Sequence, residues 1–296
     1  MPTVNRAVEL LKRGQPIYYG GAGELSYEKG VEASGRWEDY LVVEMEHGLF
    51  DLPGLKAFMA GLVDAGPTSG GHLTPCIIVT LPTNGTSEAV MRANAWMVKQ
   101  LLALGVHGLL LCHAETPGAV RAFVEAARYP FHTRGVGEGL EVGQRGSGGQ
   151  GFAAGTWGLA VPDYVKQADV WPLNPEGELM LGLKIENQRA LANVDESLAV
   201  PGIAFAEWGP GDMGMSFGYP DRHDPPYPPE MIAARSAVLK ACKANGVAFL
   251  DGVTPDNVTD RIDEGVMVSG CSPEAAEIGK RHTGRDLEGP SGSGGA

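Results

Sequence analysis

The chain has 296 residues, 43% of them hydrophobic and 20% charged, a length that α/β barrels reach as a single domain. Its formal net charge of −13 opposes the phosphate neutralisation on which nucleic-acid binding depends, and no run of lysine or arginine offsets it, so we expect no nucleic-acid partner. Because no apolar run approaches the ~18 residues that cross a bilayer, we expect no membrane partner either.

Eight short apolar runs recur along the chain, each bounded by glycine, proline or polar turn residues. The predicted strands cover residues 17–21, 40–45, 76–81, 108–112, 181–185, 203–208, 247–251 and 266–269. Stretches with helical periodicity separate them; Asp51 and Thr116 are predicted N-caps, and Gly105, Gly246 and Gly265 are predicted C-terminal caps. This alternation favours an α/β fold with a parallel sheet, and eight units favour closure into a (β/α)8 TIM barrel. A doubly wound open sheet is the alternative, because periodicity does not report closure.

We predict one domain over residues 1–285 and a flexible tail over residues 286–296, which are rich in glycine and serine. Residues 135–158 interrupt the regular pattern with ten glycines, and we expect them to form a mobile loop over the active site. Within this segment, residues 146–151 match G-x-G-x-x-G, but no strand is predicted before the match and no helix after it. We therefore interpret the match as a by-product of glycine density.

Ionisable residues follow three of the predicted strands, where a barrel enzyme carries its active site. Alternation along one strand places Lys184 and Glu186 on the same face, so they either form a buried ion pair or bind something. Asp212 lies in a Gly-Pro-Gly-Asp turn after the next strand, where aspartate also caps turns. Two carboxylates from adjacent strand ends suit a hard divalent cation, with Mg2+ and Mn2+ as candidates and Co2+ as a further one.

A histidine accompanies acidic residues at the end of the second strand. Placed beside Glu44 and Glu46, His47 is a candidate general base with an oriented imidazole; the alternative is a histidine that only hydrogen-bonds to a neighbouring acid. His113 and Glu115 follow the fourth strand and form a similar pair, to which we assign at most a place in the lining of the site.

Several short motifs occur in one order along the chain. They are Glu46-His47-Gly48, Arg128-Tyr129-Pro130, Arg134-Gly135-Val136-Gly137, Ile185-Glu186 followed by Arg189-Ala190-Leu191, Val200-Pro201-Gly202-Ile203, and Gly209-Pro210-Gly211-Asp212 with Gly218-Tyr219. In this order the chain resembles the HpcH/HpaI aldolase family, which includes relatives of citrate lyase β-subunits and macrophomate synthase. The resemblance implies a barrel, assembled as a homo-hexamer from a trimer of dimers, that cleaves a 4-hydroxy-2-oxo acid into a pyruvate-type 2-oxo acid and an aldehyde.

The resemblance also implies residue roles. Glu186 and Asp212 fall on the two carboxylate metal ligands, and His47 falls on the histidine that acts as base. Gly211, in the metal turn, is a candidate substrate-binding residue.

Four positions depart from the family pattern. The arginine that grips the substrate carboxylate and stabilises developing charge is absent, with Leu81 at the end of that predicted strand. Lys184 replaces a glutamine, Glu44 an aspartate beside the histidine, and Ala103 an acid. Losing a guanidinium from a carboxylate site should cost several kcal/mol unless another cation replaces it. Lys184 is the main candidate for that replacement, and Arg134 and Arg145 are secondary candidates.

The sequence thus predicts a metal-dependent carbon–carbon lyase that forms or consumes the enolate of a 2-oxo acid, with His47 and Lys184 as catalytic residues and Glu44 beside them. The lost arginine motivates an alternative, a metal-dependent decarboxylase or hydratase of a related oxo acid. A further alternative is a non-catalytic paralogue in which Lys184 takes the metal's place beside Glu186. The four cysteines show no C-x-x-C spacing and the amino terminus no leader pattern, so we expect a cytoplasmic protein.

Overall fold

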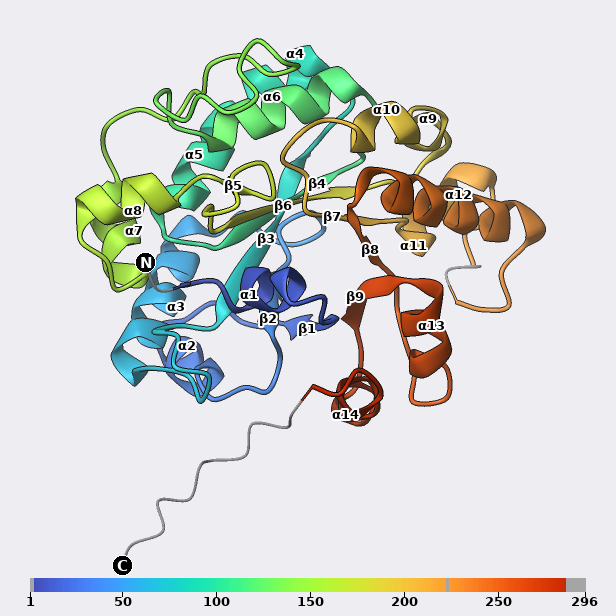
Figure 1. Ribbon diagram of the computed structural model, residues 1–296, viewed down its shortest axis with the longest axis horizontal. Coiled ribbons are helices and arrows are strands. Elements are labelled where there is room, and N and C mark those ends of the chain that lie inside the picture. The colour runs from blue at the N-terminus through green and yellow to red at the C-terminus, as the bar shows by residue number, and fades with distance from the viewer. Residues whose placement is uncertain (1–2, 222–223, 286–296) are drawn as a thin grey trace, which may run out of the picture.

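Eight parallel strands form a closed barrel surrounded by helices (Figure 1). The structure, a computed structural model, describes residues 3–221 and 224–285. The barrel strands are β1 Ile17–Gly21, β2 Tyr40–Val43, β3 Cys76–Asn84, β4 Gly108–Cys112, β6 Leu179–Lys184, β7 Phe205–Glu207, β8 Ala248–Leu250 and β9 Val266–Gly270. The predicted tail over residues 286–296 lies outside the described residues.

Closure follows from the strand pairing. β1 pairs with both β2 and β9, and β4 pairs with β6, so the sheet has no free edge among the eight strands. A ninth strand, β5 Val170–Trp171, pairs with Leu179 and Met180 at the start of β6. The pairing of β6 with β7 begins later in β6, at Gly182. The (β/α)8 barrel is confirmed and the open sheet is excluded; the prediction missed β5, which has only two residues.

The described helices alternate with the strands and cover the outside of the barrel. They are α1 Arg6–Lys12, α2 Tyr27–Ala33, α3 Leu52–Ala65, α4 Glu88–Ala93, α5 Ala95–Ala103, α6 Pro117–Ala127, α7 Gln150–Thr156, α8 Val161–Gln167, α9 Gln188–Ala192, α10 Val194–Leu198, α11 Pro210–Phe217, α12 Pro229–Asn245, α13 Val258–Glu264 and α14 Pro273–His282. The two predicted N-caps are confirmed, since Asp51 accepts a hydrogen bond from the Gly54 backbone and Thr116 from the Ala119 backbone. None of these helices is long and apolar enough to span a membrane.

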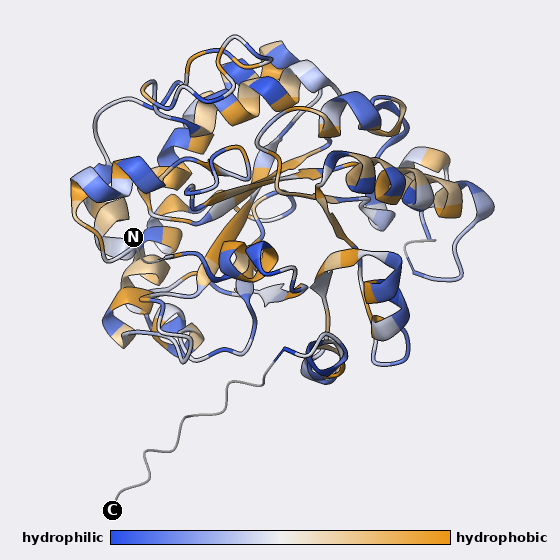
Figure 2. Ribbon diagram, viewed as in Figure 1, coloured by the Kyte–Doolittle hydropathy of each residue, from blue (hydrophilic) through white to orange (hydrophobic). Residues whose placement is uncertain are grey.

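The barrel interior is apolar at the amino ends of the strands. Its buried residues include Ile17, Tyr40, Cys76, Ile78, Leu110, Met180, Phe205, Leu250 and Val268, which pack against Ala7, Val8 and Leu10 of α1. Gly182 is required in this layer because a Cβ there would collide with the ring of Phe205. Figure 2 shows hydrophobic strands at the centre of the molecule and hydrophilic stretches on the surrounding helices. Helix α1 therefore closes the amino end of the barrel, and we look for polar catalytic residues at its carboxyl end.

The glycine-rich segment differs from the prediction. Helix α7 begins inside the G-x-G-x-x-G match, after Gly149 at a φ of 77°. The indole of Trp157, just after α7, donates to the Gly105 carbonyl at 2.8 Å and stacks on His107, and both partners directly precede β4. The carboxyl-terminal part of the segment thus packs against the amino end of the barrel, and the prediction that it lies over the active site is wrong. Its glycines hid the helical spacing of the buried Ala153, Ala154 and Trp157.

A buried carboxylate ties the amino-terminal segment to the barrel. Glu178, directly before β6 and 4% exposed, accepts hydrogen bonds from the backbone N–H groups of Val4 and Asn5 at 3.2 and 3.0 Å. Burial raises its pKa from 4.5 to about 7, although these hydrogen bonds and Lys12 oppose the rise. Because the folded protein holds this proton more tightly than the unfolded chain, stability falls as the pH rises from 4.5 to about 7.

Glu178→Gln should make the protein more stable than the parent at about pH 8. Glutamine keeps an oxygen for both backbone N–H groups but carries no charge, so the expected gain reaches about 3 kcal/mol at most. The difference should largely disappear at about pH 4.5, where the parent side chain is protonated in the folded state. Urea denaturation at both pH values measures the difference in the free energy of unfolding between Glu178→Gln and the parent. An equal difference at the two pH values would contradict the raised pKa of Glu178.

Candidate metal centre and active site

Four ionisable side chains meet at the carboxyl ends of the barrel strands. Glu46 follows β2, His113 follows β4, Glu186 follows β6, and Asp212 lies in the first turn of α11 after β7. One nitrogen or oxygen atom from each lies within 4.8 Å of the others. The structure therefore brings the two predicted metal ligands, Glu186 and Asp212, together. It adds Glu46 and His113, which were not predicted as ligands from the sequence.

The cluster fits a divalent cation. Glu46 Oε1 is buried and accepts no hydrogen bond from any described residue. The Glu186 side chain is 1% exposed; burial raises its pKa to about 9, and the charge of Glu46 adds to the rise while Lys184 opposes it. Three carboxylates in so small a volume repel one another unless a cation lies between them, and oxygen donors are those that Mg2+ and Mn2+ prefer.

Lys184 lies beside the cluster with its ammonium group already paired. It contacts Glu46 Oε2 in a short ion pair and lies 3.8 Å from Glu186 Oε2, and its neighbour in the β6–β7 register is Glu207. Burial alone would lower the pKa of Lys184, but the charges of Glu207 and Glu186 and the Glu46 contact outweigh it and raise the pKa. Lys184 thus neutralises carboxylates of the protein, which leaves it poorly placed to replace the missing arginine.

His47 faces the cluster from the open side. Its Nε2 lies 3.5 Å from Glu46 Oε2 and 3.7 Å from Asp212 Oδ2, and its side chain is 64% exposed. Glu44 holds the turn that carries it, accepting hydrogen bonds from the backbone N–H groups of Glu46 and His47 and from the hydroxyl of Thr80. Burial would raise the pKa of Glu44, but these hydrogen bonds outweigh it and lower the pKa. Glu44 therefore positions the backbone of His47 and does not orient its imidazole.

The turn that carries Asp212 depends on glycine. Gly209 caps α11 at a φ of 49°, and a Cβ there would meet the side chain of Glu186. Gly211 has no atom within 4 Å of its Cβ direction, so a ligand has room beside it. Because the first N–H groups of a helix lack intrahelical acceptors, this turn offers donors to an anion next to Asp212.

The structure moves two predicted cations away from the site. The carbonyl of Arg134 accepts a hydrogen bond from Arg128, which pairs with Asp169 just before β5, at the amino end of the barrel. Arg145 is buried against the ring of Tyr129, in the same region. Neither arginine reaches the cluster of its own chain, so the prediction that Arg134 binds substrate there is wrong. The sequence order could not show that α6 carries the chain back to the opposite end.

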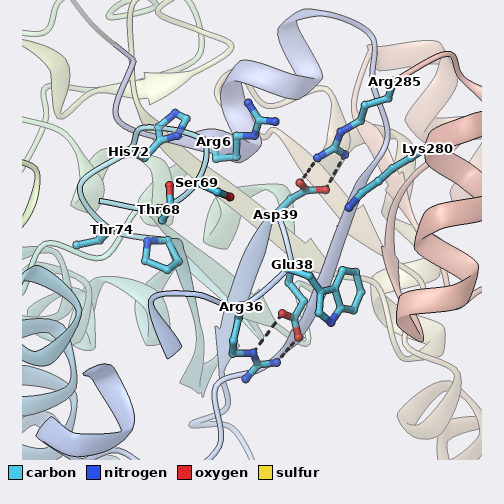
Figure 3. Close-up of a pocket in the computed structure, with 13 residues that line it drawn as sticks. Arg6, Arg36, Glu38, Asp39, Thr68, Ser69, His72, Thr74, Lys280 and Arg285 are labelled. Atoms are coloured by element: carbon cyan, nitrogen blue, oxygen red, sulfur yellow. Dashed lines mark hydrogen bonds and ion pairs between the residues drawn. The ribbon is translucent and has the colours of Figure 1, made fainter. Parts of the chain in front are cut away.

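A second concavity lies at the amino end (Figure 3). It is lined by Arg6, Arg36, Trp37, Glu38, Asp39, Thr68, Ser69, Gly70, His72, Thr74, Pro75, Lys280 and Arg285. Figure 3 shows two-pronged pairs of Arg36 with Glu38 and of Arg285 with Asp39, so its carboxylates are neutralised within the pocket. The cluster at the carboxyl ends of the strands instead includes a buried carboxylate oxygen, Glu46 Oε1, that has no hydrogen-bond partner among the described residues, and we place the candidate active site there.

Comparison with known proteins finds relatives of one family. The family model described as HpcH/HpaI aldolase/citrate lyase matches residues 76–266. The 2-keto-3-deoxy-L-rhamnonate aldolase of Klebsiella pneumoniae is 32% identical over 169 residues, which is 56% of this chain and 57% of that protein. The enzyme of the same name from Salmonella schwarzengrund is 33% identical over 156 residues, 52% of each chain. The chain thus spans about half the length of the curated relatives it matches.

Solved structures share the fold. An HpcH/HpaI aldolase/citrate lyase family protein from Burkholderia cenocepacia has a TM-score of 0.69 at 21% identity, covering 95% of this chain and 97% of its own. Macrophomate synthase has a TM-score of 0.67 at 19% identity, covering 95% and 87%. The citrate lyase β-subunit from M. tuberculosis, complexed with oxaloacetate and magnesium, has a TM-score of 0.52 at 16% identity, covering 90% and 96%.

Proposed function

Because this chain belongs to the HpcH/HpaI aldolase/citrate lyase family, we propose that it is a metal-dependent carbon–carbon lyase that cleaves a 4-hydroxy-2-oxo acid into a pyruvate-type 2-oxo acid and an aldehyde. One observation carries the proposal: the carboxylates of Glu186 and Asp212 converge at the carboxyl end of the barrel, with the exposed imidazole of His47 3.7 Å from Asp212. This is where barrel enzymes carry their catalytic residues.

Glu186 and Asp212 would hold the cation, and Glu46 offers a third carboxylate oxygen. A bound Mg2+, Mn2+ or Co2+ ion supplies a Lewis acid that polarises the carbonyl of the oxo acid and stabilises negative charge on it. The donor turn at Gly211 would receive the substrate carboxylate. Since oxygen donors suit all three ions, the choice among them stays open.

His47 would act as the base. Its imidazole accepts the proton of the C4 hydroxyl group as the C3–C4 bond breaks, which releases the aldehyde and leaves the electron pair in the enolate of the oxo acid. The carboxylates of Glu46 and Asp212, within 4 Å of Nε2, stabilise the imidazolium that results. Returning the proton to C3 completes the oxo acid and restores the neutral ring.

The absence of arginine at Leu81 favours one second candidate. Leu81 is fully buried in the core, before the end of β3 at Asn84, and presents no cation to the site. A decarboxylase or hydratase acting on a related oxo acid would use the same cluster but would bind the substrate carboxylate in a different way. A non-catalytic paralogue is less consistent with the structure, because the shorter contact of Lys184 is with Glu46 and not with Glu186. For the assembly we propose a homo-oligomer, and for the location the cytoplasm.

Replacing His47 tests the proposal. With 2-keto-3-deoxy-L-rhamnonate and related 4-hydroxy-2-oxo acids as substrates, His47→Ala should lower the rate of pyruvate release about 10²- to 10⁴-fold, the usual contribution of a general base. Its Tm should stay near that of the parent, since the side chain is exposed. EDTA should abolish the activity of the parent, and added Mn2+ or Mg2+ should restore it.

The matched control is His282→Ala, which removes a surface histidine of α14 that contacts only Asp263 in the described chain and should leave the rate unchanged. Unchanged pyruvate release in His47→Ala would show that another group is the base.

A further inference from the structure

His113 has an unusual backbone conformation next to the cluster. At a φ of 44° it is the one residue other than glycine with positive φ in the described ranges 3–221 and 224–285. Its backbone N–H donates to Glu186 Oε1 at 2.7 Å. A side-chain-bearing residue in this region is held there against a cost of about 1 kcal/mol or more by its surroundings. The position of the His113 ring is therefore dictated by the site.

Asn187 fixes how that ring carries its proton. The side-chain oxygen of Asn187 caps α9, accepting the backbone N–H groups of Arg189 and Ala190 at 3.0 and 2.9 Å. The amide nitrogen is thereby turned the other way, 3.2 Å from His113 Nδ1 and 3.1 Å from Glu115 Oε1. Flipping the amide would break both capping hydrogen bonds, so this orientation is the stable one.

The acid nearest to His113 Nδ1 is Glu186 Oε1 at 3.7 Å, beyond a hydrogen bond, so the partner of Nδ1 is the Asn187 amide nitrogen. An amide nitrogen only donates, so Nδ1 has to accept, and the proton of the neutral imidazole is on Nε2. This Nε2–H points into the cluster, where its nearest acid is Glu46 Oε1 at 3.6 Å. That distance exceeds a hydrogen bond, so the donor is not consumed by the protein. With a proton on the nitrogen that faces the cluster, His113 is a poor metal ligand, and the three carboxylates are left as the ligands.

We propose that His113 is the hydrogen-bond donor that takes over from the missing arginine, and that Asn187 is the positioning residue that keeps its proton on Nε2. This inference rests on the proposed function, because the acceptor is an oxygen of the 2-oxo acid on which negative charge grows during bond cleavage. The ammonium of Lys184 is held by Glu46, whereas the His113 donor is available. A neutral donor that is already oriented toward the substrate stabilises the developing negative charge without having to reorganise during bond cleavage.

The tautomer can be read directly in the parent protein. In 15N-labelled protein with its divalent metal, NMR of the histidine side chains, assigned by the signal lost in His113→Asn, should show His113 protonated at Nε2 and bare at Nδ1. Asparagine is the replacement for the assignment because it tolerates positive φ. A proton on Nδ1, or Nε2 bound to the added metal, would overturn the proposal.

Asn187→Asp, combined with Glu115→Gln, reverses the hydrogen bond. Aspartate still caps α9 through one oxygen, while its second oxygen accepts and draws the proton of His113 to Nδ1; glutamine at 115 avoids a new pair of carboxylates. We expect kcat to fall about 100-fold, the loss seen when one donor of this kind is removed. The Mn2+ Kd should not rise above that of the parent, because a bare Nε2 removes no ligand from the cluster and can add one. Glu115→Gln alone is the matched control: it should keep the parent tautomer, and the fall in kcat is measured relative to this variant.

The two failures are distinguishable because the tautomer is measured without turnover. A shifted tautomer with unchanged kcat would overturn the role of His113 and leave the lyase proposal standing. The expected tautomer in a protein that cleaves no 4-hydroxy-2-oxo acid would overturn the proposed function and, with it, the substrate contact of His113.

Discussion

Glu186→Gln should abolish tight binding of divalent metal while leaving the barrel folded. The substitution keeps the shape of the side chain and removes the charge of the most buried ligand. Second-shell changes at metal sites already weaken binding 10- to 100-fold, so the loss of a ligand charge should weaken Mn2+ binding by at least about 100-fold. Isothermal titration of the metal-free protein with Mn2+ measures the effect.

The stability of this variant separates loss of metal from loss of fold. Burial raises the pKa of Glu186 to about 9, so near neutral pH the metal-free protein folds only at the cost of protonating this carboxyl group, and its stability falls as the pH rises from 4.5 to about 9. Glu186→Gln should therefore be at least as stable as the parent in EDTA. Glu176→Gln, an exposed position before β6, is the matched control and should retain parental Mn2+ affinity. Parental affinity in Glu186→Gln would mean that the metal binds elsewhere.

Lys184→Met should destabilise the metal-free protein strongly. The substitution leaves Glu46, Glu186 and Glu207 around an apolar side chain, and removing one partner of a buried ion pair costs about 3–5 kcal/mol. Added Mn2+ should recover part of this loss, because a cation between the carboxylates supplies the missing positive charge. Urea denaturation in EDTA and in Mn2+ measures both effects.

Lys166→Met is the control for Lys184, because Lys166 is exposed and its Nζ lies 3.8 Å from Oδ1 of Asp163, one turn earlier on the same helix. It should change stability by less than about 0.5 kcal/mol. Equal stability of Lys184→Met and the parent in EDTA would contradict the role of Lys184 as the internal counter-charge. A gain in Mn2+ affinity without loss of stability would instead support the alternative in which Lys184 occupies the metal's place.

Local patterns predicted most of the barrel. Each barrel strand has its own apolar run, so residues 17–21 and 108–112 were predicted with their observed bounds. The two-residue β5 is too short for any period to show. Helix α7 was not predicted because glycines break the spacing of its buried face. Its position was not predicted because its packing against the amino end of the barrel is a tertiary contact.

The site was predictable only in part, because its chemistry depends on distances across the closed barrel. Glu186, Asp212 and His47 stand at strand ends, which is a property of the sequence. The ion pair of Lys184 with Glu46 joins residues 138 positions apart, and only closure brings them together. The proton on His113 is set by an amide whose orientation depends on capping α9. Arg134 was misassigned because the sequence does not say at which end of the barrel a loop lies.

Exchange of the C3 protons of pyruvate in D2O, followed by NMR, reports enolate formation at the metal centre whatever the aldehyde partner is. We expect the parent protein to show exchange that disappears with EDTA, returns with Mn2+ or Mg2+, and is absent in Glu186→Gln and in His47→Ala. No exchange with either metal, in protein shown by titration to bind it, would contradict a pyruvate-type enolate at this site.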